Sequence, residues 1–401
     1  MIYDYDIVVV GAGPIGGYLS KKLSESKHKV LLIEEHQEIG RPFQCAGLVN
    51  PGAMEKVGLH DTALTRIWGA RMHSPSGVKI EIGEPDITRT WSVCRKIFDE
   101  KLVIQSIESG TDLWLSSKPL SAEILDEHVN LKVQFKNEER MIRTKLLCGA
   151  DGAHSWVRRN FKMGRPKEMM IGLQIEVTGY KSEEGKLDLF TGKNISPGFF
   201  SWAIPSGETT RIGIWSKPNL LGDYSCEHYL NQLMNNSPWK DKFSDCIEVG
   251  RFCGPVPSGI LKKPTKERVV LFGDAAGICK PTTGGGIGPG FKQVDILLPL
   301  INEAISENDL SEKRMNGLSN AMNGMRKSQR RKKALRDAFL TEVSDQELDE
   351  IFSIWARPEV IDLINELGDI ENPIPLGIKM LKEVPEFRRF AGKATMAILW
   401  S

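Results

Sequence analysis

The sequence predicts an α/β protein: a discontinuous Rossmann-like domain, a substrate domain of α+β type built on an antiparallel sheet, and a helical C-terminal region. Three buried strand patterns (YDIVVV, LLCGA and RVVLFGD) each run into a glycine-containing turn, which is typical of parallel α/β sheets. The stretch between the last two alternates polar and apolar residues, as antiparallel strands do. Beyond Leu310, apolar residues recur at helical spacing.

These patterns divide the chain into three parts. We expect the Rossmann-like domain to comprise 1–67, 94–165 and 256–310, the sheet domain 68–93 and 166–255, and the helical region 311–401.

The first strand leads directly into a nucleotide-binding motif. Gly11, Gly13 and Gly16 form G-x-G-x-x-G, a helix pattern follows, and the next strand pattern ends at Glu34. An acidic residue at this distance from the glycines binds a ribose hydroxyl in dinucleotide-binding folds. Strand, glycines, helix, strand and acid in this order predict a bound dinucleotide, although the motif alone does not separate NAD from FAD.

Each glycine has a separate task. Gly11 allows the tight turn, Gly13 lets a pyrophosphate approach the backbone, and Gly16 lets the helix pack closely on the strand. Pro14 and Ile15 lie between them at the helix start, whose N-terminus faces the phosphates. We therefore include both in the expected cofactor site.

Bulk composition excludes several classes of function. With 53 basic and 52 acidic residues, the net charge is +1, which gives no field for nucleic acid. The 7 cysteines form no C-x-x-C pair and their number is odd, so we expect free thiols, no metal site and a cytoplasmic protein. No apolar run is long enough to span a bilayer.

Two later turns indicate which dinucleotide binds. One strand ends at Ala150-Asp151-Gly152, and another ends at Gly273-Asp274 before a second glycine-rich helix start. The three-part pattern resembles the FAD-dependent oxidoreductases of the p-hydroxybenzoate-hydroxylase type. The resemblance implies that Asp274 contacts the ribityl or pyrophosphate region of FAD. Asp151 either contacts FAD or has a structural role.

The same resemblance implies further FAD contacts. The helix start at Gly285, Gly286 and Ile287 would face the flavin pyrimidine ring, where a helix N-terminus stabilises the negative charge of reduced flavin. Arg95 matches the arginine of R-x-x-F-D-x-x-L, with a surface arginine at a helix start as the alternative. Pro119, at the end of a strand pattern, matches a backbone contact near the adenine.

Two stretches resemble the archaeal geranylgeranyl reductases in particular. Cys45, Ala46 and Gly47 match the end of a P-x-x-C-(small) loop beside the flavin. PGFFSWAIP, residues 197–205, matches P-x-x-Y-x-W-x-F-P in the substrate domain, except that Phe200 replaces tyrosine and Ile204 replaces phenylalanine.

By period two, Phe200, Trp202 and Ile204 share one face of a strand and form an apolar wall for an uncharged substrate. The alternative is a sheet face buried against the Rossmann-like domain. Cys45 is either a proton donor beside the flavin or a packing residue; we take Cys45 and Trp202 as the catalytic candidates.

The resemblance implies an FAD-dependent reductase that hydrogenates isolated C=C bonds of geranylgeranyl chains, on archaeal-type membrane lipid precursors. NAD(P)H or a ferredoxin-like protein would supply electrons. The alternatives are an aromatic or quinone monooxygenase and an electron-transfer flavoprotein that reduces a quinone. The basic run Arg326–Lys333 and the terminal ATMAILW would suit peripheral contact with the inner face of the membrane, or a solvated helix face and core packing.

Overall fold

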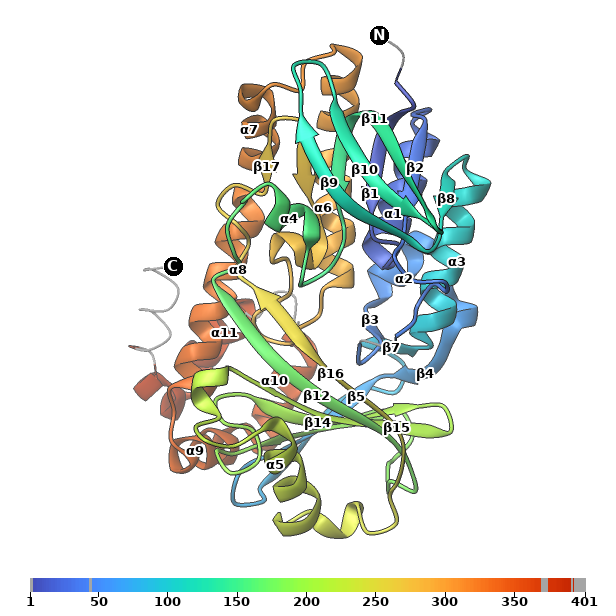
Figure 1. The fold of residues 1–401 in the computed structure, drawn as a ribbon. Coiled ribbons are helices and arrows are strands. Elements are labelled where there is room, and N and C mark those ends of the chain that lie inside the picture. The colour runs from blue at the N-terminus through green and yellow to red at the C-terminus, as the bar shows by residue number, and fades with distance from the viewer. Residues whose placement is uncertain (1–2, 43–44, 369–373, 391, 393–401) are drawn as a thin grey trace.

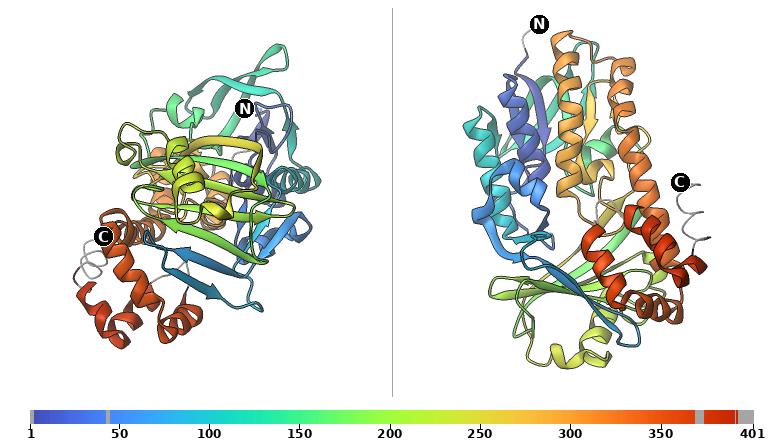
Figure 2. Two further views of the ribbon diagram at one scale, coloured as in Figure 1. Left: turned by 90° about the horizontal axis from the view of Figure 1, so that it is seen from below. Right: turned by 180° about the vertical axis from the view of Figure 1, so that it is seen from behind.

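A computed structural model of the chain describes residues 3–42, 45–368, 374–390 and 392. Figure 1 shows a Rossmann-like domain above, a broad sheet below, and helices of the C-terminal region along one side. Figure 2 shows the same arrangement from below and from behind. This architecture confirms the predicted fold class.

The upper domain is built on an eight-stranded sheet with the order β17-β18-β11-β1-β2-β8, extended by β10 and β9. Its parallel strands are covered by helices, so β1, β2 and β18 bury almost every side chain. Helices α1, α3 and α6 pack side by side. The strands are β1 (Tyr5–Val10), β2 (Val30–Ile33), β8 (Asp112–Trp114), β9 (Ser117–Ile124), β10 (Val129–Phe135), β11 (Glu138–Gly149), β17 (Thr265–Lys266) and β18 (Val269–Leu271), and the helices are α1 (Pro14–Glu25), α2 (Pro51–Val57), α3 (Arg95–Glu108), α4 (Trp156–Asn160) and α6 (Ile287–Ser306).

The lower sheet has seven strands in the order β16-β12-β15-β14-β13-β5-β6, and all neighbours are antiparallel except β13 and β5. Helix α5 (Cys226–Asn231) covers one face, and the other face lies toward the Rossmann-like domain (Figure 1). The strands are β5 (Gly69–His73), β6 (Lys79–Gly83), β12 (Glu168–Thr178), β13 (Lys186–Thr191), β14 (Phe200–Ser206), β15 (Thr209–Ser216) and β16 (Ile247–Ser258).

A small third sheet, β3-β7-β4, lies between the two domains (Figure 1). It consists of β3 (Leu48–Val49), β4 (Ala63–Ile67) and β7 (Thr90–Val93). The segment 68–93 therefore divides, because β5 and β6 join the lower sheet whereas β7 pairs with strands of the upper domain's segment. The domain boundaries themselves stay a prediction.

The C-terminal region is helical, as expected. Its elements are α7 (Glu312–Ala321), α8 (Asn323–Arg336), the π-helical turn η6 (Asp337–Thr341), α9 (Asp345–Trp355), α10 (Pro358–Leu367), α11 (Ile374–Glu383) and η7 (Pro385–Phe390). Helices α9 and α10 contact β6 of the lower sheet. Within the described ranges, no helix is long and apolar enough to cross a membrane. ATMAILW, residues 394–400, lies outside them.

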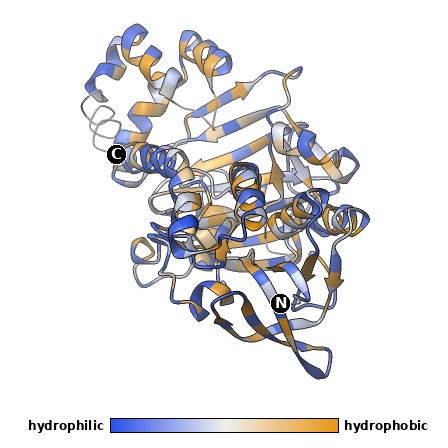
Figure 3. Cartoon of the chain, turned by 90° about the horizontal axis from the view of Figure 1, so that it is seen from above, coloured by the Kyte–Doolittle hydropathy of each residue, from blue (hydrophilic) through white to orange (hydrophobic). Residues whose placement is uncertain are grey.

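Hydrophobic residues gather in the central strands of the molecule (Figure 3). One prediction about a strand end is wrong: Pro119 does not end a strand but lies buried inside β9, opposite Val133 of β10. The strand pattern in that segment is interrupted near Ser116, which has a positive φ of 50° and separates β8 from β9. Its role in the adenine site stays a prediction.

Candidate FAD and substrate site

The glycine loop between β1 and α1 has the geometry that the motif predicts. Gly11 has φ +97°, and a Cβ atom there would lie 2.6 Å from the carbonyl oxygen of Ala150. A Cβ on Gly16 would overlap the carbonyl oxygen of Gly11. Both glycines are therefore required by the packing of the loop itself.

Gly13 is different, because a Cβ atom there would meet nothing within 4 Å. Its φ of −71° is also open to any residue. The fold gives no reason for glycine at this N-cap, whereas a pyrophosphate resting on the backbone does. A second indication is Thr282, whose buried hydroxyl lacks a hydrogen-bond partner in the described part of the chain. These residues fit a dinucleotide.

Pro14 and Ile15 begin α1, as their place in the motif predicts. Pro14 occupies the first turn, where a missing N–H costs nothing. The side chain of Ile15 packs against Gly273 and Gly290, so a Cβ on either glycine would press on it. Ile15 therefore holds the first nucleotide loop against the second one.

Glu34 follows β2 and reaches back to the glycine loop. Its Oε2 accepts a hydrogen bond from Ala12 N at 2.8 Å, and its Oε1 accepts one from His36 N at 3.1 Å. The His36 ring also bonds to Oε1, at 2.6 Å. The carboxylate is thus fixed at the end of β2, where the predicted ribose contact requires it.

Asp274 and the start of α6 meet at one point. Asp274 lies in the 3₁₀ turn after β18, and the thiol of Cys279 donates to its Oδ1 at 3.0 Å. A Cβ on Gly286 would lie 3.0 Å from that Oδ1 and 3.3 Å from Cys279 Sγ. Burial raises the pKa of Asp274. Helix α6 begins at Ile287 with Gly286 as N-cap, so the predicted helix start is correct, and Gly285 precedes it.

Asp151 serves the structure in the way that one of its two interpretations expects. Its Oδ2 accepts a hydrogen bond from Val157 N at 2.9 Å, at the start of α4. Burial raises the pKa of Asp151. This contact satisfies a backbone N–H in the first turn of α4, whose N-cap is Ser155, and the alternative FAD contact of Asp151 stays a prediction.

Cys45 lies in a loop that points back toward α3. Its Sγ accepts a hydrogen bond from Gly47 N at 3.3 Å, and residues 43–44 of the loop are outside the described ranges. Arg95 opens α3 and makes a bidentate ion pair with Asp99, at 2.9 and 2.7 Å. Burial lowers the pKa of Arg95, but Asp99 and then the neighbouring Cys45 outweigh it, so that pKa is raised. Arg95 is thus a mostly buried cation beside Cys45.

Arg211, which the sequence patterns do not single out, joins the Cys45 loop to the lower sheet. It lies on β15, 2% exposed, and its Nη1 donates to Ala46 O at 2.9 Å and to Val93 O at 3.1 Å. Burial lowers the pKa of Arg211, and the nearby Glu176 and Cys45 offset this effect only in part. The available signal was a charged residue inside an otherwise buried strand, TTRIGIWS.

The aromatic wall that PGFFSWAIP predicts lies on the same face as Arg211. Ile204 pairs with Arg211, and Trp202 pairs with Gly213, where a Cβ would overlap the Trp202 ring. Cross-strand pairs share a face, so Phe200, Trp202 and Ile204 lie together, toward the Rossmann-like domain. Trp202 Nε1 donates to Gln174 Oε1 at 3.2 Å.

Trp215, which the sequence patterns also do not single out, extends this wall to Gly284, just before α6. Its ring centroid lies 5.8 Å from that of Phe200, and a Cβ on Gly284 would lie 3.2 Å from its Cζ3. Phe200 and Trp202 are half-buried, whereas Ile204 is only 3% exposed. The accessible part of the wall therefore consists of Phe200 and Trp202, and Ile204 and the 2% exposed Trp215 pack beside them.

The chain matches the family described as FAD binding domain over residues 4–307. A digeranylgeranylglycerophospholipid reductase of Methanocaldococcus jannaschii is 31% identical over 316 residues, 77% of this chain and 79% of that protein. The one of Methanococcus vannielii is 29% identical over 397 residues, 96% and 97% of the two chains.

Among solved structures, a geranylgeranyl bacteriochlorophyll reductase-like protein from Thermoplasma acidophilum superposes with a TM-score of 0.85 at 23% identity, over 97% of this chain and 99% of that one. A flavin-dependent brominase superposes with a TM-score of 0.73 at 19% identity, over 96% and 99% of the chains. These likenesses concern the fold alone.

The fold and the site together define an FAD-dependent oxidoreductase. The chain belongs to the FAD binding domain family and, within it, to the geranylgeranyl reductase family. The choice of FAD over NAD is thereby confirmed. The roles of the individual site residues stay predictions.

Proposed function

We propose that this protein hydrogenates isolated C=C bonds of geranylgeranyl chains, on archaeal-type membrane lipid precursors. The observation that carries the proposal is the wall of Phe200, Trp202 and Trp215, which lies against Gly284 before α6. An apolar wall beside a flavin site suits an alkene, which has no oxygen to polarise. The names of the relatives from Methanocaldococcus jannaschii and Methanococcus vannielii support the same substrate class.

When bound and reduced, FAD supplies a hydride for such a reaction. The wall keeps water out and aligns the chain, and the face of Trp202 stabilises the cationic character that develops on the alkene. The hydrogen bond from Trp202 to Gln174 fixes the orientation of the ring. These are the contributions of this chain to binding and orientation.

Cys45 is the proposed proton donor. Its sulfur accepts from Gly47 N, which fixes the thiol and leaves the S–H free to donate to the second alkene carbon. The Arg95 guanidinium lies next to Cys45, and solvent then restores the proton to the sulfur. The geometry of the loop thus favours proton donation over simple packing.

The remaining partners follow from this proposal. NAD(P)H or a ferredoxin-like protein is the proposed electron donor, and a prenyl lipid is the proposed substrate. We propose a cytoplasmic protein with peripheral contact to the inner face of the membrane, where such a lipid resides.

The test is anaerobic. The purified yellow protein is reduced with dithionite and mixed with a geranylgeranyl lipid, and the product mass is read. Our proposal expects a gain of ~2 Da for each reduced bond, together with flavin reoxidation. An unchanged mass, with a hydroxylated aromatic product or a reduced quinone in separate trials, would replace it with one of the alternatives.

A further inference from the structure

The basic run Arg326–Lys333 belongs to α8, and this helix has an inner side as well as a solvated one. Gln329 and Arg336 are only 9% and 4% exposed, whereas Lys327 and Arg330 are exposed. A buried amide and a buried guanidinium require partners. Their partners identify what the inner side of α8 holds.

Gln329 uses both ends of its amide group. Its Nε2 donates to Gly277 O at 3.0 Å and to Cys279 O at 2.7 Å, and its Oε1 accepts from Ile260 N at 2.7 Å. Gly277 and Cys279 lie in the segment between the Asp274 turn and α6. Gln329 therefore binds the backbone of that segment from outside the Rossmann-like domain.

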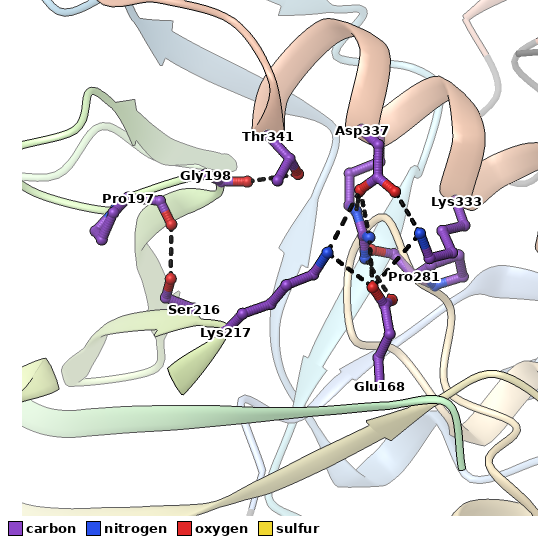
Figure 4. A network of polar contacts seen from close by, with 10 residues as sticks. Glu168, Pro197, Gly198, Ser216, Lys217, Pro281, Lys333, Asp337 and Thr341 are labelled. Carbon is purple, nitrogen blue, oxygen red and sulfur yellow. Dashed lines mark hydrogen bonds and ion pairs between the residues drawn. The ribbon is translucent and has the colours of Figure 1, made fainter. Parts of the chain in front are cut away.

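Arg336, two turns further along α8, binds the same segment. Its Nη1 donates to Pro281 O at 3.0 Å and to Glu168 Oε2 at 3.1 Å. Its Nη2 and Nε bond to Glu168 and Asp337, so every guanidinium N–H is used. Figure 4 shows this network, with Lys333 completing it around the two carboxylates.

Arg336 also connects the segment to the lower sheet. Glu168 is the first residue of β12. Its Oε1, which accepts from Arg336 Nη2, also pairs with the Nζ of Lys217, just after β15, at 2.8 Å. The Arg336 guanidinium lies 5.0 Å from the ring centroid of Phe199, next to the aromatic wall. Helix α8 thus contacts both the segment that precedes α6 and the sheet that carries the aromatic wall.

We propose that Gln329 and Arg336 are positioning residues, which hold the flavin-side loop, Gly277–Pro281, and thereby set the start of α6 against the flavin. Every second carbonyl of this loop (277, 279 and 281) is bound by α8. The inference goes beyond the proposed function, because it concerns the FAD site and holds for any substrate.

The physical reason lies in the charge at the start of α6. An N-terminus stabilises the negative charge of reduced flavin only while it stays close and well aligned. Release of the loop carbonyls from α8 lets that N-terminus and the Asp274 turn shift. Reduced flavin is then stabilised less relative to oxidised flavin, and the affinity for FAD falls.

The direct test uses Gln329→Met in the FAD-loaded full chain. This change keeps the length of the side chain and removes its donors and its acceptor. We expect FAD to leave about tenfold faster on dilution, read by flavin fluorescence, because three buried backbone groups lose a hydrogen bond and Cys279 O keeps only the one from Ser258 Oγ. We also expect a more negative flavin midpoint potential.

Two controls on the same helix separate positioning from mere support. Arg330→Ala removes an exposed cation and should leave release rate, potential and stability unchanged. Arg326 donates to Leu261 O, Lys262 O and Ser319 O, which lie outside the flavin-side loop. Arg326→Met should therefore lower stability to urea, while the release rate and the potential stay at their wild-type values.

Arg336→Lys provides the second, conservative variant. It keeps a cation beside Glu168 but loses the planar fork, so we expect a smaller shift in both readouts than for Gln329→Met. Wild-type release rate and potential in both Gln329→Met and Arg336→Lys would overturn the proposal. So would an equal shift in potential for Arg326→Met. No lipid is present, so a failure of the reductase proposal leaves these readouts intact.

Discussion

The seven-stranded sheet buries an arginine on each of its faces, and the two arginines are used differently. On the face under α5, Arg71 makes a bidentate ion pair with Asp188, at 2.9 and 2.6 Å. His73 and Tyr180 also bond to Asp188, at 2.7 and 2.8 Å. This face satisfies its polar groups within its own domain.

On the opposite face, Arg211 binds backbone carbonyls of the Cys45 loop and the third sheet instead. Of the aromatic rings on this face, Phe200 and Trp202 stay half-buried, whereas Phe190, stacked on His73 at 4.7 Å under α5, is fully buried. Both faces therefore bury an arginine and aromatic rings. What distinguishes the functional face is that, besides contacts within the sheet such as Trp202–Gln174, its arginine binds carbonyls outside the sheet.

The largest effect we expect is on the structural face. Asp188→Ala removes the carboxylate shared by Arg71, His73 and Tyr180, and leaves a buried cation. The free energy of unfolding should fall by about 3–5 kcal/mol in urea titrations. The FAD spectrum of the folded fraction should be unchanged. A folded, fully stable variant that has lost FAD would contradict the structural role of this face.

Next in size is Cys45→Ala, in the loop that Arg211 binds from the functional face. Loss of a proton donor should slow turnover of a geranylgeranyl lipid about 100-fold, while stability and FAD content stay as they are. Cys253→Ala, at an exposed cysteine of β16, is the matched control and should have no effect. Full activity of Cys45→Ala would reduce Cys45 to a packing residue.

A smaller effect is expected at Gly13. A methyl group there meets no protein atom, so Gly13→Ala should leave the stability of the FAD-free chain unchanged and speed FAD release about tenfold. Gly16→Ala should instead destabilise the chain, because its Cβ overlaps Gly11. Equal losses of stability in both variants would contradict a ligand-based reason for Gly13.

The smallest effect concerns pH. Burial raises the pKa of Asp188, but the hydrogen bond with His73 and the charge of Arg71 outweigh it, so that pKa lies below the ordinary 3.8. A depressed pKa means that the stabilisation is complete above 3.8 and is lost as pH falls through the native value. Wild type and Asp188→Asn should therefore differ most above pH 4 and converge in more acidic urea titrations. A constant difference down to pH 2 would count against this ion pair.

Local patterns predicted much of this molecule. The glycine loop, Glu34, Asp274 and the start of α6 follow from residues that are close in sequence, because strand ends and helix starts need particular residues. Phe200 and Trp202 were found because a strand alternates its faces.

The residues that join the domains could not be found in this way. These residues contact carbonyls or rings that are far away in sequence, and the contacts form only when the sheet and α8 pack against the rest of the chain. They are Arg211, Trp215, Gln329 and Arg336. The basic run illustrates the limit, since its composition suggested only a solvated or lipid-facing helix.

The central claim is that the functional face serves an alkene beside the flavin. The most direct measurement is the rate of flavin reoxidation in stopped flow, with the dithionite-reduced protein mixed separately with a geranylgeranyl lipid, oxygen and a quinone. We predict that the lipid reoxidises the flavin at the rate of turnover, and that Cys45→Ala slows this reaction alone. Fast reoxidation by oxygen or quinone, with no response to the lipid, would contradict the account.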